Sequence, residues 1–345
     1  MDVDADGWGY ENGLSCTHSV QKLDGENEDN PASNSGSDVV VFEQSFDQST
    51  LGMYTGKDLN EQWNTPLWHL GFDQGRASIV EEQGRGNSLR ITYPAGEFGA
   101  AGASAFLSDL EFAVDLPANF EELYISYDVK FAEGFEFVRG GKLPGLCGYD
   151  ITRTPGTGCN TGGGFPDGFD GWSARGMWRE GGEMENYVYH SSQESFYGDD
   201  EFWGMKARPG QWHQIQHRVV LNTVGEADGL LEAWFDGQKV LNETDFVYRK
   251  TSDIGINLFY FSTFFGGNDP SWAPATDQYI FFDNFRIATT PLPGTISRAT
   301  ALNDDGLAIA AAESSGGGGS VAWSLTLLAV VRLRRSGQSE IMQHY

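Results

Sequence analysis

Short runs in which hydrophobic and polar residues alternate recur along the central part of the chain. A period of two places every second side chain on the same face of a β-strand. Gly, Pro, Asn and Asp, which favour turns, bound these runs. We therefore expect strands at residues 39–46, 77–81, 88–93, 123–131, 171–179, 183–190, 211–221, 229–235, 239–242, 256–263 and 279–286.

This series of strands predicts an all-β fold. No long segment has the period of an amphipathic helix, and the chain contains 45 Gly and 13% aromatic residues. The segment LLEAWFDGQKVL is typical of a hairpin that turns at Asp236 and Gly237. Many short strands joined by turns favour a β-jelly roll, a concanavalin A-like sandwich of two sheets.

Composition divides the 345 residues into four parts. Residues 1–37 are polar and acidic, which predicts a disordered leader or linker. Residues 38–290 contain the expected strands and form the predicted jelly-roll domain. Residues 291–320 form a Gly/Ser-rich linker, and residues 321–345 combine a short apolar stretch with an Arg cluster.

The formal charge of −27 disfavours nucleic acid and anionic membranes as partners. It suits a protein in a salty medium. Residues 139–179 differ, because five basic and three acidic side chains give this stretch a net charge of +2. The basic stretch indicates either an anionic ligand or a chance cluster on a solvated face.

Three Cys residues are present. Cys147 and Cys159 lie on either side of a loop rich in Gly and Thr, where a disulfide would contribute about 3 kcal/mol. Two free buried thiols are the alternative, and secretion favours the disulfide. Cys16 has no evident partner.

Asp2, Asp4 and Asp6, followed by Gly7, have a spacing that resembles calcium loops in linkers of secreted bacterial proteins. However, Gly13 occupies the place where an EF-hand loop carries an acid. We favour a plain acidic linker over a structural calcium site.

The C-terminal segments SSGGGGS, VAWSLTLLAVV and RLRR together resemble the GlyGly sorting tails of Gram-negative bacteria. The apolar run is too short for an ordinary spanning helix, and a small packed terminal helix is the alternative. The resemblance implies a secreted or surface protein with transient contacts to export and sorting machinery. No N-terminal signal is visible; a start downstream of the true one, or intracellular residence, would each explain this.

The segment WSARGMWREGGEMENYVYH, residues 172–190, predicts a hairpin with an unusually polar face. Alternation places Ser173, Arg175 and Arg179 on one face of the first strand. A three-residue loop at 180–182 pairs Arg175 with Tyr187 and Ser173 with Tyr189, whereas a two-residue loop would separate the two sets.

We prefer the three-residue loop because it buries the Trp residues with Val188 and leaves the polar set in the open. An ordinary solvated face remains the alternative. Upstream, Lys142 lies between two Gly residues and an expected turn at Pro144 and Gly145.

GGKLPGL, followed by S-x-R-x-M-W-R and then Y-x-Y, resembles the family 14 polysaccharide lyases. That family contains alginate and glucuronan lyases with a β-jelly roll fold, and the resemblance is strongest over residues 139–190. It implies that the functional positions are Lys142, Ser173, Arg175, Tyr187 and Tyr189.

Such a lyase breaks the bond at C4 of a uronate by β-elimination. Arg175 or Lys142 would neutralise the carboxylate, so that the C5 proton becomes acidic. Tyr187 and Tyr189 would supply the base and the acid, or a desolvated Lys142 would supply the base. Ser173 would orient the carboxylate or a Tyr hydroxyl. Further substrate-binding candidates are Arg139, Arg179 and His190.

This chemistry requires no metal or organic cofactor. We expect a monomer acting on an anionic polysaccharide, with alginate as first candidate and glucuronan as second. The rivals are a noncatalytic glycan-binding module, a surface adhesion protein and a glycoside hydrolase that would use Glu183 and Glu185. We expect His213 and His217 to be packed rather than catalytic.

Overall fold

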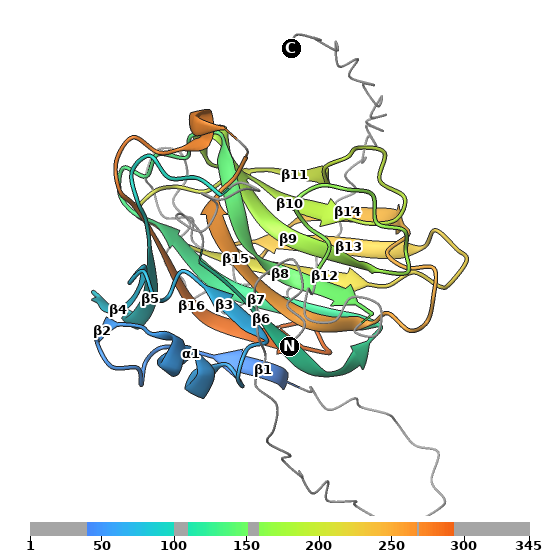
Figure 1. The fold of residues 1–345 in the computed structure, drawn as a ribbon, viewed down its shortest axis with the longest axis horizontal. Helices are drawn as coiled ribbons and strands as arrows, with labels where there is room; N and C mark the ends of the chain where they lie inside the picture. Colours follow the sequence, from blue (N-terminus) through green and yellow to red (C-terminus); the bar gives the residue numbers. More distant parts are fainter. Residues whose placement is uncertain (1–39, 100–109, 151–158, 268, 293–345) are drawn as a thin grey trace, which may run out of the picture. The chain divides into compact units, whose positions relative to one another are not determined.

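The computed structural model describes residues 40–99, 110–150, 159–267 and 269–292 (Figure 1). The expected acidic leader with Asp2, Asp4, Asp6 and Cys16, most of the linker, and the expected sorting tail lie outside the described residues. None of the helices in the described part has the length and hydropathy needed to cross a membrane.

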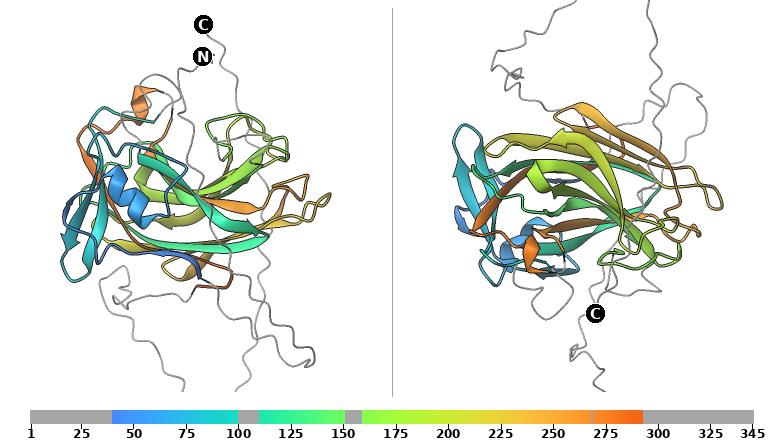
Figure 2. Two further views of the ribbon diagram at one scale, coloured as in Figure 1. Left: turned by 60° about the horizontal axis from the view of Figure 1, so that its bottom comes forward. Right: turned by 90° about the horizontal axis from the view of Figure 1, so that it is seen from above.

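The described residues form two antiparallel sheets (Figures 1 and 2). The larger sheet has the order β14-β13-β12-β7-β16-β5-β4-β2, with β1 also paired to β16. Its strands are β1 (Val40–Gln44), β2 (Gly52–Met53), β4 (Ala77–Glu82), β5 (Gly86–Tyr93), β7 (Glu122–Phe131), β12 (Trp212–Val220), β13 (Gly229–Phe235), β14 (Gln238–Phe246) and β16 (Gln278–Ala288).

The smaller sheet has the order β11-β10-β9-β8-β15-β6-β3. Its strands are β3 (Trp68–Leu70), β6 (Leu110–Phe120), β8 (Gly140–Tyr149), β9 (Gly171–Arg179), β10 (Glu183–Tyr189), β11 (Asp199–Lys206) and β15 (Ile256–Phe265).

An aromatic core joins the two sheets. Trp63, at the end of helix α1 (Gly56–Gln62), stacks on Phe259 of the smaller sheet and meets Phe285 of the larger sheet edge-on, with ring centroids 5.6 and 5.3 Å away. Such contacts bury large apolar area from both layers. The prediction of an all-β, two-sheet jelly-roll fold is therefore confirmed.

Each of the eleven expected strands is present in the described part, and β9 and β13 have the predicted bounds. Helix α1 and strands β2, β3, β6, β8 and β11 were not expected. Pro117 interrupts the apolar pattern of β6, acidic residues open β11, and β2 and β3 are very short. A capping box between Thr55 and Asp58 starts the helix.

The expected turn at Pro144 and Gly145 is wrong, because both residues lie within strand β8. The register with β9 instead shifts between Lys142 and Gly145, which pair with Met177 and Arg175 respectively. A bulge accommodates a proline that cannot donate to the ladder. The extra residue places Lys142 and Gly145 on the same face, although an uninterrupted strand would put them on opposite faces.

The β9–β10 hairpin has the predicted three-residue loop, Glu180–Gly182. The loop turns through positive φ at Gly181 and Gly182. Trp172, Trp178 and Val188 are fully buried in the core between the sheets, as expected.

Candidate active site

The candidate residues gather on the outer face, which we define as the face of the smaller sheet that is turned away from the core. Arg175 pairs with Tyr187, and Ser173 pairs with Tyr189, across β9 and β10. Lys142 of β8 lies beside Met177 of β9. Figure 1 shows these three strands side by side. The register thus brings together all five positions that the sequence singled out.

This polar set is not open to solvent, which corrects the expectation from alternation alone. Lys142 is 8% exposed, Arg175 2% and Tyr187 7%. Trp272, from the connection between β15 and β16, packs against the cluster that Met177 forms with the two tyrosines. Alternation assigns a side chain to a face, but whether connecting segments cover that face depends on the tertiary fold.

Lys142 occupies a buried position without a carboxylate partner among the described residues. Its Nζ donates to Met177 Sδ at 2.7 Å and lies 3.5 Å from the centroid of the Tyr187 ring. Burial lowers the pKa of Lys142 well below its ordinary value, and the positive charges of Arg175 and Arg179 lower it further. The amine is therefore suited to accept a proton.

The two tyrosines form a hydrogen-bonded pair. Their hydroxyl oxygens are 3.4 Å apart. Gly163 N–H donates to Tyr189 OH at 2.8 Å, and Gly198 N–H donates to Tyr187 OH at 3.2 Å. Burial raises the pKa of Tyr187 above its ordinary value, so that the phenol stays protonated and can donate.

Arg175 reaches across to a second polar layer that sequence reasoning missed. Its Nη1 donates to Ser262 Oγ at 3.1 Å, and Ser262 donates to Glu111 Oε1 at 2.6 Å. Tyr260 OH also donates to that oxygen, at 2.9 Å. Arg175 Nε is buried and has no hydrogen-bond partner in the described part of the chain. A cation with an unused donor is suited to bind a carboxylate.

The alternation of β15 and β6 places Tyr260, Ser262 and Glu111 on the outer face, where Ser262 pairs with Glu111. Polar residues at alternate positions in FYFST were a signal in the sequence. Glu111 lies in β6, which the sequence pattern did not reveal. Burial raises the pKa of Glu111, while its hydrogen bonds and the charge of Arg175 oppose the shift.

Ser173 anchors a neighbouring loop. Its hydroxyl donates to the Asn160 carbonyl at 2.6 Å. Cys147, which pairs with Ser173 in the sheet, is joined to Cys159 by a disulfide with 5.6 Å between the Cα atoms. The disulfide and this hydrogen bond hold the start of the loop 159–170 over the outer face.

Arg179 and Arg139 lie at the other end of the face. Arg179 Nε donates to Glu185 at 2.6 Å, and its Nη2 bonds Asp200. Burial is the main cause that raises the pKa of Glu185 to about 8. Arg139 is half-exposed, stacks over Trp272 and donates to Ser271 at 2.7 Å. Both cations are near the site and both have acidic partners, since Arg179 bonds Asp200 and Arg139 Nη1 lies 3.9 Å from Asp269.

The carboxylates that a hydrolase would use have cationic partners. Glu185 bonds Arg179, and Glu183 lies 3.5 Å from Lys206. This arrangement does not resemble two facing carboxylates with room for a sugar between them.

His190 is not part of this group, although the sequence suggested it as a substrate-binding residue. Its ring bonds Ser192 at 2.9 Å and Asp199 at 2.8 Å, and packs edge-on against Phe246. As the neighbour of Tyr189, it is directed away from the outer face.

His213 and His217 are packed, as expected. His213 bonds Asp236 at 2.8 Å and stacks on Phe235. His217 is 1% exposed, and burial lowers its pKa to about 3.

The outer face therefore combines a buried amine, a guanidinium with an unused N–H, and two phenols. These groups can neutralise an anion, accept a proton and donate a proton within one small area.

Comparisons with known proteins agree with this chemistry. The family model described as Polysaccharide lyase 14 matches residues 81–285. A marine PL-14 alginate lyase from Aplysia kurodai is 27% identical, with a TM-score of 0.62 over 73% of this chain and 100% of that chain. No curated protein sequence matches the chain.

Two less similar solved structures share the fold. A double variant of alginate lyase Aly36B in complex with an alginate tetrasaccharide is 21% identical, with a TM-score of 0.61 over 74% of this chain and 98% of that chain. Alginate lyase vAL-1 from Chlorella virus is 20% identical, with a TM-score of 0.53 over 66% of this chain and 100% of that chain.

Proposed function

The chain belongs to polysaccharide lyase family 14, and from this premise we propose that it cleaves alginate by β-elimination. The observation that carries the proposal is the meeting of Lys142, Arg175, Tyr187 and Tyr189 on one buried face. The alginate lyase from Aplysia kurodai, at 27% identity, supports alginate as the substrate. Glucuronan is the second candidate, because it carries the same carboxylate beside C5.

Arg175 binds the uronate carboxylate in this proposal. The unused Nε and the guanidinium charge support this role. Neutralising the carboxylate stabilises the enolate-like charge that develops when the C5 proton leaves. Arg139, half-exposed at the edge of the face, would contact the carboxylate of a neighbouring sugar unit of the substrate.

Lys142 is the proposed base and Tyr187 the proposed acid. The lowered pKa of Lys142 favours a neutral amine, and the raised pKa of Tyr187 favours a neutral phenol. The 3.4 Å separation of the two hydroxyls allows Tyr189 to orient Tyr187 or to pass a proton to it.

The proton from C5 moves to Lys142 Nζ, and the C–H electrons form a double bond between C4 and C5. The bond from C4 to the glycosidic oxygen breaks, and that oxygen receives the Tyr187 proton. The products are an unsaturated uronate end and a second chain whose new reducing end keeps the glycosidic oxygen as a hydroxyl on C1, while Lys142 is left as an ammonium and Tyr187 as a phenolate. Atoms and charges balance without a cofactor.

We also propose that the enzyme works outside the cytoplasm. The disulfide between Cys147 and Cys159 supports an oxidising compartment. The similarity of residues 321–345 to a surface-sorting tail supports the same location.

The test is ultraviolet absorbance of the unsaturated product during incubation with alginate, glucuronan and a neutral glucan. We expect absorbance to rise with alginate and to stay flat with the neutral glucan. A rise with glucuronan alone would replace the substrate and keep the chemistry. Retention on an acidic-glycan column without any rise would contradict the proposed catalysis and indicate a binding module.

A further inference from the structure

Three exposed aromatic side chains gather on two loops beside the tyrosine pair. Phe165 is 61% exposed, Phe196 52% and Tyr197 50%. The rings of Phe165 and Phe196 meet edge-on at 5.9 Å, and those of Phe196 and Tyr197 at 5.2 Å. We call these three residues the aromatic rim. Exposed apolar groups that gather in this way mark binding surfaces more often than scattered ones do.

The loops that carry the aromatic rim are firmly held together. Gln193, which is 8% exposed, donates through Nε2 to the carbonyls of Gly164, Ser195 and Tyr197. Gly164 N–H donates to the Phe196 carbonyl at 2.8 Å. These bonds link the loop before β9 to the loop after β10, so the rings are presented from a built support.

The same two loops contact the proposed catalytic hydroxyls. Gly163, two residues before Phe165, donates its N–H to Tyr189 OH, and Gly198, next to Tyr197, donates to Tyr187 OH. Phe165 and Tyr189 also line a cavity of about 110 Å³ together with Asn160, Gly163, Gly164, Pro166 and Asp170. The aromatic rim therefore continues directly from the tyrosine end of the outer face.

We propose that the aromatic rim is a subsite for sugar units of the substrate that lie beyond the cleaved linkage. This inference rests on the proposed function, because it takes the uronate chain as the ligand. The apolar C–H face of a pyranose ring packs on an aromatic face, and the burial releases water. The basic side chains of Lys142, Arg175 and Arg179 belong to the strands rather than to the two loops, so we expect the rim to contact ring faces rather than carboxylates.

The rim then adds affinity only for chains long enough to reach it. The test compares kcat/KM for size-defined uronate oligomers, from the trisaccharide to the octasaccharide, and for the polymer. Phe165→Ala and Phe196→Ala should each lower kcat/KM on the longest substrates by about tenfold, through KM, as expected for one lost aromatic contact. The loss should shrink as the oligomer shortens.

Phe169→Ala is the matched control. Phe169 is 40% exposed in the same loop as Phe165, but it neither lines the cavity nor takes part in the two ring contacts that define the aromatic rim. It should leave the length dependence unchanged. Phe165→Ala is the rim variant least expected to disturb folding, because Phe165 is the most exposed of the three. Phe196, by contrast, packs against Gly163.

An equal loss at every oligomer length, or the same loss in Phe169→Ala, would overturn the aromatic rim as a subsite. These outcomes differ from failure of the proposed function. If the unchanged enzyme releases no unsaturated product from any uronate polymer, the lyase proposal itself fails. If it does release product and the rim variants match it at all lengths, only the subsite proposal fails.

Discussion

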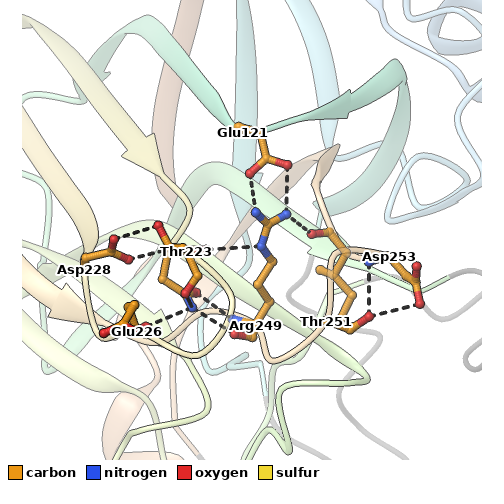
Figure 3. A network of polar contacts seen from close by, with 9 residues as sticks. Glu121, Thr223, Glu226, Asp228, Arg249, Thr251 and Asp253 are labelled. Carbon is orange, nitrogen blue, oxygen red and sulfur yellow. Dashed lines mark hydrogen bonds and ion pairs between the residues drawn. The ribbon is translucent and has the colours of Figure 1, made fainter.

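Two buried arginines serve different ends in this molecule. Arg249, which is 5% exposed, has a partner for each guanidinium nitrogen: Nη1 donates to Glu121 and Ile254, Nη2 bonds Glu121, and Nε donates to the Asn222 carbonyl (Figure 3). Arg175 is 2% exposed, yet in the described part its Nη1 donates to Ser262 and its Nε has no partner.

The difference indicates that Arg249 supports the fold, whereas Arg175 serves the proposed function. Arg249 joins the connections β6–β7, β12–β13 and β14–β15, and short side-chain bonds such as Thr223–Asp228 stiffen the same region (Figure 3). A buried guanidinium whose nitrogens all have partners suits a structural role, whereas an unused buried donor costs stability unless a ligand completes it. We therefore expect Arg175, rather than Arg249, to bind an anion.

Substitutions at Arg175 are expected to have a large effect on catalysis. Arg175→Ala should lower kcat/KM by at least about 10³-fold, because the enolate-like charge loses its main stabilising cation. Arg175→Lys should stay strongly impaired, since the point charge does not reproduce the planar donors. Product absorbance measures activity, and thermal unfolding should show an intact fold. Full activity in both Arg175→Ala and Tyr189→Phe would contradict the site.

Removing the other arginine should act on stability instead. Arg249→Ala leaves the carbonyls of Ile254 and Asn222 unpaired, which should cost about 2–3 kcal/mol of unfolding free energy. Denaturant unfolding measures this change. Activity per folded molecule should match the unchanged enzyme at low temperature. If Arg249→Ala lost activity without losing stability, the two arginines would not have the different roles that we infer.

The pH dependence tests the role of Lys142, the amine that lies beside Arg175. Because the pKa of Lys142 is lowered, its amine becomes a competent base well below the ordinary lysine pKa of about 10.4. Below that lowered pKa, kcat/KM should rise about tenfold per pH unit and then level off. Lys142→Arg should abolish turnover at every pH. If a partly active Lys142 variant kept the same rise of kcat/KM with pH, a residue other than Lys142 would be the base.

The smallest effect concerns the layer behind Arg175. Ser262→Ala removes the hydroxyl that links Arg175 to Glu111 and should lower kcat/KM about fivefold, the worth of one hydrogen bond. Glu111→Gln should cost less, because its amide oxygen still accepts from Ser262. In an Arg175→Ala background, Ser262→Ala should have no further effect. Additive losses would show that Ser262 does not act through Arg175.

Much of the outer face could be predicted from the hairpin alone. A period of two, a Gly pair and a three-residue loop were enough to pair Arg175 with Tyr187 and Ser173 with Tyr189. These are local properties, because register in a hairpin follows from the turn and from the need to bury Trp172 and Trp178. The same local reasoning failed for β8, where a proline inside a strand is typical of a turn.

Patterns along the chain were therefore enough to predict the strands, the sandwich class and one polar face of a hairpin. The three-dimensional arrangement was needed to show that a bulge directs Lys142 to that face, that Ser262 and Glu111 lie behind Arg175, and that His190 lies elsewhere. Strand alternation depends on neighbours along the chain, whereas burial, pKa and unused donors depend on strands that are distant in sequence and adjacent in the sheet.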